Sequence, residues 1–159
     1  MVAVNVESRM RLHPRRLFCN VAGDFYATGE NPKPGESRSR WMGDCWTCHG
    51  PESQAQELLA ELNSENRTTY FVRQPETEIE TERACRAVQY CCVDALRYAG
   101  QNAAIIHRLG NNPAHCDYLI AKDGRMVYCL DEKGELLPWA AGIRTAIGMG
   151  IDIPSVPTE

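Results

Sequence analysis

Three residues of this chain carry the side chains that nucleophilic attack on an amide requires: Cys45, His115 and Asp131. A thiol becomes a useful nucleophile when its pKa is lowered, and a helix N-terminus or a neighbouring imidazolium lowers it. The imidazole in turn needs a third group that holds its orientation. These three residue types are therefore sufficient for thiol catalysis if the fold brings them together.

The spacing of His115 and Asp131 suits a pair on one β-hairpin. The runs HCDYLIA (115–121) and MVYCLD (126–131) predict two strands, and Lys122-Asp123-Gly124 between them is a turn sequence. His115 lies eight residues before the Asp of this turn, and Asp131 lies seven residues after its Gly. We therefore expect the two side chains to be near neighbours across the ladder.

The order of the predicted elements indicates an α+β fold, with helices packed on an antiparallel β-meander. Thr77 and Glu80 form a capping-box pattern ahead of a long helix, and Gly100 is suited to end that helix. Residues 24–44 are rich in Gly, Pro and Ser, so we expect a long exposed loop that leads into Cys45. The expected helices cover 52–62, 78–99 and part of 137–150, and the expected strands cover 68–73, 103–109, 115–121 and 126–131.

The run Gly43-Asp44-Cys45-Trp46, followed by a predicted helix and strand and then by His115 and Asp131, resembles the papain-like and transglutaminase-like cysteine enzymes. Calpain-type proteases have a similar GDCW at their nucleophile. Bacterial transglutaminase-like peptidases have a similar GDC, and a His that one hairpin separates from an Asp. Glutamine-deamidating toxins and effectors share this layout in chains of about this size. The resemblance covers residues 43–73 and 115–131, about a third of the chain.

This resemblance implies a papain-like or transglutaminase-like core in which Cys45 is the nucleophile, His115 the general base and Asp131 the group that orients the imidazole. The implied activity is that of a peptidase or a protein glutamine deamidase. The implied substrate is a protein or peptide, and this chemistry uses no cofactor.

Cys45, Cys48 and His49 also match C-x-x-C-H, the attachment motif of c-type haem. In this alternative the two thiols form thioethers, His49 is the proximal ligand, and Met149 or Met126 could be the second axial ligand. The predicted β-meander and six further cysteines are unusual for a small cytochrome c.

Zinc is a further alternative, because Cys45 and Cys48 have the spacing of a zinc knuckle. The sequence holds no second C-x-x-C, so the remaining ligands would come from His49, Cys19, His115 or Cys116. A zinc deaminase would also need an upstream H-x-E or C-x-E element, which is missing. A non-enzymatic interaction domain is the remaining alternative.

Length and composition restrict the function classes. The chain has 159 residues, 43% of them hydrophobic, which suits one domain over 1–159. We divide it into a loop-rich part (1–44), a catalytic core (45–131) and a C-terminal segment (132–159). A net charge of −4 argues against a nucleic-acid partner. No run approaches the roughly 20 apolar residues of a membrane span, so we expect no membrane partner. The oligomeric state is left open.

The first residues, MVAVNVESRMRLHPRR, contain no apolar h-region of a signal peptide. We therefore expect a cytoplasmic protein if Met1 is the native start, and a secreted effector domain if the chain has been trimmed from a longer one.

Eight cysteines are the unusual feature of the composition. A disulfide framework is not expected in a chain that has enough apolar residues for a core. Cys85, Cys91 and Cys92 fall in the long predicted helix, and Cys116 and Cys129 fall in strands. We expect these five to pack as small hydrophobic residues. Cys19 has no interpretation.

Overall fold

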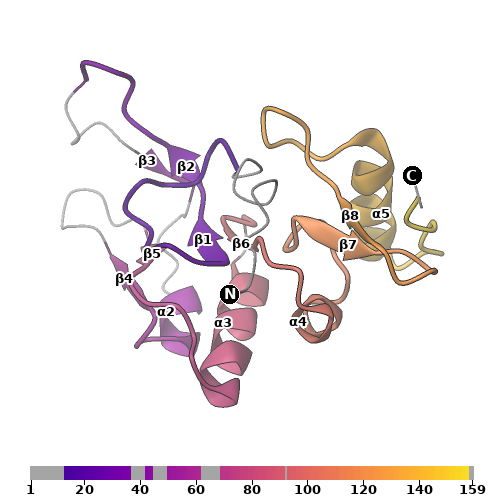
Figure 1. Ribbon diagram of the computed structural model, residues 1–159, viewed down its shortest axis with the longest axis horizontal. Coiled ribbons are helices and arrows are strands. Elements are labelled where there is room, and N and C mark those ends of the chain that lie inside the picture. Colours follow the sequence, from indigo (N-terminus) through magenta and orange to yellow (C-terminus); the bar gives the residue numbers. More distant parts are fainter. Residues whose placement is uncertain (1–12, 37–41, 45–49, 62–68, 92, 158–159) are drawn as a thin grey trace, which may run out of the picture.

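The computed structural model describes residues 13–36, 42–44, 50–61, 69–91 and 93–157. Within these ranges the prediction of an α+β fold is confirmed (Figure 1). The strands are β1 (Phe25–Ala27), β2 (Gly29–Glu30), β3 (Met42–Gly43), β4 (Leu59–Glu61), β5 (Thr69–Phe71), β6 (Leu96–Tyr98), β7 (Tyr118–Ile120) and β8 (Met126–Tyr128). The helices are α2 (Gly50–Gln54), α3 (Glu78–Tyr90), α4 (Ala103–Arg108) and α5 (Pro138–Met149).

β1, β6, β7 and β8 lie in a row that consists of two separate two-stranded sheets, so the predicted antiparallel meander is not formed by these described strands. β1 pairs antiparallel with β6, and β7 pairs antiparallel with β8. A single parallel bridge between Tyr98 and Cys116 joins the two pairs, because the chain that enters β7 first passes alongside β6. Figure 1 shows α3 and α4 below this row and α5 beside β8.

The core lies where β1, β5 and β6 meet α3. The Phe25 ring packs on Tyr98 and on Phe71, with centroid distances of 4.9 and 5.8 Å. α3 contributes the buried side chains of Ala84, Cys85, Ala87 and Val88. Aromatic pairs at these distances add specific attraction to their burial, which fixes the relative positions of the strands.

The long helix begins where the capping box predicts, but it is shorter than expected. Thr77 Oγ1 accepts from the backbone N–H of Glu80 at 3.1 Å. The helix ends at Tyr90 rather than at residue 99, and the chain then continues into strand β6. A continuous helix is suggested by the helical spacing of the apolar residues Ala84, Val88, Cys91, Ala95 and Ala99. The last two flank β6, and a buried strand requires the same apolar residues as a helix face.

The predicted strand at 103–109 is wrong, since these residues form α4. The Asn102 side chain accepts from the backbone N–H groups of Ala104 and Ile105, which caps the helix. Ala103 and Ala104 then favour a helix, while Ile106 and Leu109 supply its buried side. The apolar spacing is that of a short helix and not of a strand.

Two further expectations are corrected. The predicted helix at 52–62 is limited to α2, Gly50–Gln54, and the chain turns into β4 from Leu59. The predicted loop at 24–44 contains β1, β2 and β3. The predicted helix at 52–62 is cut short because β4 pairs with β5, with Leu59 opposite Phe71. Tertiary pairing thus outweighs the local helix propensity.

The hairpin and the C-terminal helix are confirmed. β7 and β8 are joined by a turn in which Gly124 has φ +86°, a conformation that suits glycine. α5 begins with Pro138 in its first turn and ends at Gly150 in the left-handed region. The helices of the described ranges are all too short to cross a bilayer.

Candidate active site

Of the residues predicted to do chemistry, His115 and Asp131 lie in the described ranges. Cys45, Cys48 and His49 lie outside them. The predicted nucleophile and the C-x-x-C-H residues on which the haem and zinc alternatives depend therefore have no described geometry, whereas the further ligand candidates Cys19, Cys116, Met126 and Met149 do lie in the described ranges. The described part of the site therefore consists of residues next to Cys45 in the sequence, together with His115 and Asp131.

The hairpin has the predicted register, but its ladder does not reach His115 and Asp131. Tyr118 lies opposite Tyr128, and the backbone N–H of Cys129 donates to the carbonyl of Asp117 at 3.0 Å. Beyond this bond the strands separate. The carbonyl of His115 accepts from Tyr98, whereas the N–H of Asp131 donates to the carbonyl of Glu135.

The Asp131 carboxylate is used within its own turn. Its Oδ1 accepts from the backbone N–H groups of Lys133 at 2.8 Å and Glu135 at 2.9 Å. This is the turn-forming role that Asp commonly takes. The structure therefore describes no contact between the Asp131 carboxylate and the His115 ring.

His115 is half-buried, and its Nδ1 has no hydrogen-bond partner among the described residues. Burial lowers the His115 pKa, the negative charge of Asp94 partly opposes this shift, and the positive charges of Arg97 and Arg144 add to it. The imidazole is accordingly neutral at pH 7, the state in which it can accept a proton.

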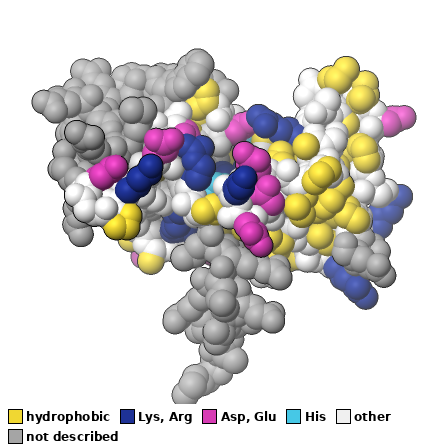
Figure 2. All heavy atoms as spheres, turned by 90° about the horizontal axis from the view of Figure 1, so that it is seen from above, with side chains coloured by type: hydrophobic (Ala, Val, Ile, Leu, Met, Phe, Trp, Pro, Cys, Tyr) yellow, Lys and Arg dark blue, Asp and Glu magenta, His cyan; other side chains and the backbone are white. Residues whose placement is uncertain are grey.

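A cavity of about 690 Å³ opens between the N-terminal part of the chain and α5. Figure 2 looks down on the top of Figure 1 and shows basic and acidic side chains side by side across the middle of this face, with a histidine between them. The titratable and charged residues that line the cavity are His13, Arg15, Asp44, Asp94, Arg97, Lys133, Glu135 and Arg144. A cavity lined by paired charges suits a polar ligand.

Asp44 lies in one wall of the cavity and is tightly held. Its Oδ2 accepts from the Thr28 hydroxyl at 2.7 Å, and its Oδ1 accepts from Arg15 Nη2 at 2.8 Å. Its backbone N–H donates to the carbonyl of Thr28, which continues the pairing of β2 with β3. Asp44 directly precedes Cys45 in the sequence.

The cavity lining also holds a second ion pair, between Asp94 and Arg144 of α5, at 2.6 Å. Asp94 has φ +54°, a conformation that few residues other than Gly, Asn and Asp adopt. It follows the end of α3 and precedes β6, so a short loop turns its carboxylate toward α5. Two carboxylates, each held by an arginine, thus line the cavity.

His13 lies in the cavity wall, but its ring already contacts backbone groups. Its Nδ1 accepts from the N–H of Arg15 at 3.0 Å, and the ring lies against Gly134. Burial lowers the His13 pKa, Asp117 partly opposes this shift, and a backbone hydrogen bond at Gly134 opposes it further. His13 is therefore a neutral structural histidine and a weaker candidate base than His115.

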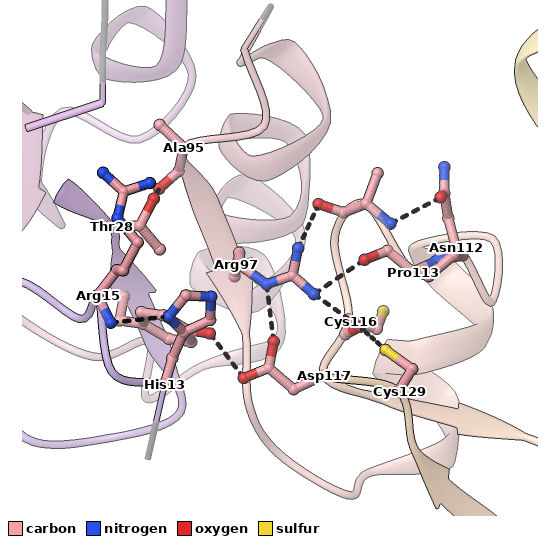
Figure 3. A network of polar contacts seen from close by, with 12 residues as sticks. His13, Arg15, Thr28, Ala95, Arg97, Asn112, Pro113, Cys116, Asp117 and Cys129 are labelled. Atoms are coloured by element: carbon pink, nitrogen blue, oxygen red, sulfur yellow. Dashed lines mark hydrogen bonds and ion pairs between the residues drawn. The ribbon is translucent and has the colours of Figure 1, made fainter. Parts of the chain in front are cut away.

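A buried polar network underlies the cavity (Figure 3). Arg97 Nε donates to Asp117 Oδ1 at 2.7 Å, and the Tyr26 hydroxyl donates to Asp117 Oδ2 at 2.6 Å. Burial alone would lower the Arg97 pKa, but the adjacent Asp117 carboxylate outweighs it and raises that pKa. Burial and Asp117 both raise the Tyr26 pKa, so its hydroxyl stays protonated and donates.

The described cysteines are poor nucleophiles. Burial raises the pKa of Cys19 and Cys85 to about 11, and that of Cys116 and Cys129 to about 12. Because the thiolate is the reactive form, these four thiols are unreactive at neutral pH. The expected core packing of Cys85, Cys91, Cys116 and Cys129 is confirmed, and Cys92 lies outside the described residues.

Arg97, Asp117 and Tyr26 were not among the residues predicted from the sequence. Arg97 and Asp117 stand in otherwise apolar strand segments, LRY and CDYLI, where a charged residue at a buried position is a usable signal. Asp94 and Arg144 could not be found in this way, because they come from a loop and an exposed helix face.

No family model matches this chain, and comparisons with curated proteins and with solved structures gave no significant match either. Within the described ranges, three or more His, Cys, Asp or Glu side chains do not come together in a way that could hold a metal ion.

Proposed function

We propose that the protein is a cysteine-dependent amide hydrolase, in which the Cys45 thiol attacks a carboxamide or peptide carbonyl at the charged cavity. The observation that carries the proposal is the position of Asp44, directly before Cys45, in the wall of that cavity. Ala114, directly before His115, lines the same cavity. The sequence neighbours of the nucleophile and of the base thus meet at one place.

Two further observations support this assignment. The cysteines with a resolved pKa shift are all raised to about 11 or 12 by burial, so they do not compete with Cys45. His115 is neutral and has a free Nδ1, so it can take a proton. A thiol, a neutral imidazole and a polar cavity are the parts that amide hydrolysis by cysteine requires.

In the proposed reaction, His115 takes the thiol proton as the Cys45 sulfur bonds to the carbonyl carbon. The tetrahedral intermediate then collapses, the C–N bond breaks, and His115 returns the proton to the leaving ammonia or amine. Water, deprotonated by His115, hydrolyses the thioester and releases the acid. Peptidase and glutamine deamidase activity share these steps and differ only in the amide that is attacked.

Asp94 is a stronger candidate than Asp131 for the acid that supports the imidazole. The charge of Asp94 acts on His115, whereas Asp131 Oδ1 already accepts two backbone N–H groups. The role of Asp131 implied by the family resemblance is thus transferred to Asp94 in this proposal, and a protein or peptide remains the proposed substrate.

The proposal is tested by iodoacetamide labelling and peptide mapping between pH 5 and 9. We expect Cys45 to be alkylated at least about tenfold faster than Cys48 at pH 7, because the neutral His115 imidazole can take the thiol proton as the sulfur attacks. His115→Asn should remove this advantage, and Asp94→Asn should reduce it more than Asp131→Asn. His107→Asn, on the exposed face of α4, is the matched control. Equal rates at Cys45 and Cys48 in the unaltered protein would refute the proposal.

A further inference from the structure

Arg97 on β6 uses its guanidinium to bind the backbone on both sides of His115. Its Nη1 donates to the carbonyl of Ala114 at 3.0 Å, and its Nη2 donates to the carbonyls of Pro113 at 2.8 Å and Cys116 at 3.0 Å. Ala114 and Cys116 are the two direct neighbours of His115 in the chain. Figure 3 shows the guanidinium pointing into this bend of the backbone.

The backbone of His115 is held at its own atoms as well. Its N–H donates to the carbonyl of Asn112 at 3.0 Å, and its carbonyl accepts from the N–H of Tyr98 at 2.8 Å. Tyr98 directly follows Arg97 in β6. The backbone of Tyr98 and the side chain of Arg97 therefore both hydrogen-bond the turn that contains His115. The position of the His115 Cα is therefore set from β6.

Asp117 and Tyr26 hold Arg97 in the orientation that this role requires. Arg97 is 6% exposed and Asp117 is fully buried, so water does not compete for their hydrogen bonds. A buried ion pair contributes little net stability after desolvation, so what it supplies best is a single defined geometry. The planar fork of arginine can serve a carboxylate and several carbonyls together, which a lysine ammonium cannot.

We propose that Arg97 is a positioning residue for His115, and that Asp117 and Tyr26 hold Arg97 in place. The role of His115 as a base rests on the proposed function. The position of His115, however, can be measured without any enzymatic activity. The charged groups that act on His115 are Asp94, Arg97 and Arg144, and only Arg97 also binds the backbone that carries it.

NMR can separate the effect of the Arg97 hydrogen bonds on the position of His115 from the effect of the Arg97 charge. Arg97→Lys keeps the positive charge and loses the fork, while Tyr26→Phe removes only the hydroxyl bonded to Asp117. Tyr98→Phe is the matched control, because Tyr98 is also a buried core tyrosine and its hydroxyl accepts from Asn102 instead. Hydrogen exchange is measured at the amides of His115 and Cys116, both of which donate to Asn112. The His115 ring is titrated in the same samples.

We expect exchange at these two amides to rise at least about tenfold in Arg97→Lys, and by less in Tyr26→Phe, because the turn opens locally. We also expect the titration midpoint of His115 to move in both variants and to stay in place in Tyr98→Phe. Wild-type exchange and titration in Arg97→Lys would overturn the proposal. If Arg97→Lys does not fold, the test passes to Tyr26→Phe. Amide exchange and a His115 titration midpoint in Tyr26→Phe that equal those of the unaltered protein or of Tyr98→Phe would then overturn the proposal.

The outcome is independent of the proposed function. If Cys45 is no more reactive than Cys48 in the unaltered protein, the hydrolase proposal fails while the NMR result for Arg97 still stands. If Cys45 is reactive and its alkylation profile against pH is the same in Arg97→Lys and in the unaltered protein, the positioning proposal fails alone.

Discussion

The hydroxyl of Tyr26 donates a 2.6 Å hydrogen bond to Asp117, a residue 91 positions further along the chain. Asp117 binds Arg97 through its other oxygen, so one carboxylate joins β1, β6 and the segment that leads into β7. β1, β6 and the segment before β7 are thereby fixed against one another by polar atoms inside an apolar core. We expect the stability of this region to depend on the Asp117 carboxylate.

Asp117→Ala should destabilise the protein by about 3–5 kcal/mol, because it leaves the Arg97 guanidinium buried without its counter-charge. The free energy of unfolding, measured by urea denaturation, checks this. Asp123→Ala is the control, because Asp123 forms an exposed ion pair with Arg125 at 3.3 Å, and such pairs contribute about 0–1 kcal/mol. Similar losses in the two variants would contradict the role given to Asp117.

Gly134→Ala should cost more stability than Gly124→Ala. Both glycines have positive φ, +81° and +86°, so both variants carry the same backbone strain. A Cβ at Gly134 would lie 2.4 Å from His13 Cε1, whereas a Cβ at Gly124 meets no atom within 4 Å. We expect an additional loss of about 1–3 kcal/mol for Gly134→Ala from this overpacking. Thermal unfolding of the two variants under one buffer condition measures the difference.

Cys116 and Cys129 should resist alkylation in the folded protein. Burial raises the pKa of both thiols to about 12, so the thiolate fraction at pH 8 is about one in ten thousand. Mass spectrometry after iodoacetamide treatment should find both residues unmodified in buffer and modified in 6 M guanidinium chloride. Rapid labelling of either residue in buffer would contradict the buried position of the hairpin cysteines.

Stability should fall as the pH is lowered below about 6.5, and His13 should contribute to this fall. Its pKa is lowered in the folded state, so between the unfolded value of about 6.5 and the lower folded value the unfolded chain binds more protons. Protonation thus favours unfolding in that window. His13→Asn, which can still accept from Arg15, should flatten the dependence of the unfolding free energy on pH. An equal slope in the unaltered protein and in His13→Asn would contradict the assignment.

A thiol hydrolase should need neither zinc nor haem. Purified protein should contain less than about 0.1 zinc per chain by elemental analysis, since a structural zinc site would be close to fully occupied. Protein from a host competent in cytochrome c maturation should show no Soret band and no covalent mass increase. Stoichiometric zinc or attached haem would assign Cys45, Cys48 and His49 to a ligand set instead.

Local signals allowed part of the fold to be predicted. The Thr77 cap and the turn at Gly124 depend on neighbouring residues and lie where they were predicted, and the helix predicted within 137–150 is present as α5. Elements that depend on distant partners were missed. β4 exists because β5 pairs with it, and β1 exists because β6 does, so the propensity of each segment alone pointed elsewhere.

The same distinction applies to the site. The hairpin register follows from its own turn, but the separation of the strands before His115 is caused by β6, which takes the carbonyl of that residue. The sequence pattern could not indicate that the charge of Asp94 contributes to the His115 pKa, or that the Asp131 carboxylate is used within its own turn. The left-handed backbone of Asp94 and its ion pair with Arg144 exist only in the assembled structure.

The pairing of β1 with β6 also has a consequence for folding during synthesis. Phe25 and Tyr26 are buried in the folded chain, but the strand beside them ends at Tyr98, and the acceptor for the Tyr26 hydroxyl is made later still. A ribosome therefore exposes these aromatic residues long before their partners emerge, and contacts of such sequence separation form slowly. The nascent chain should be prone to aggregation and should gain from chaperones that cover apolar segments until residue 117 is available.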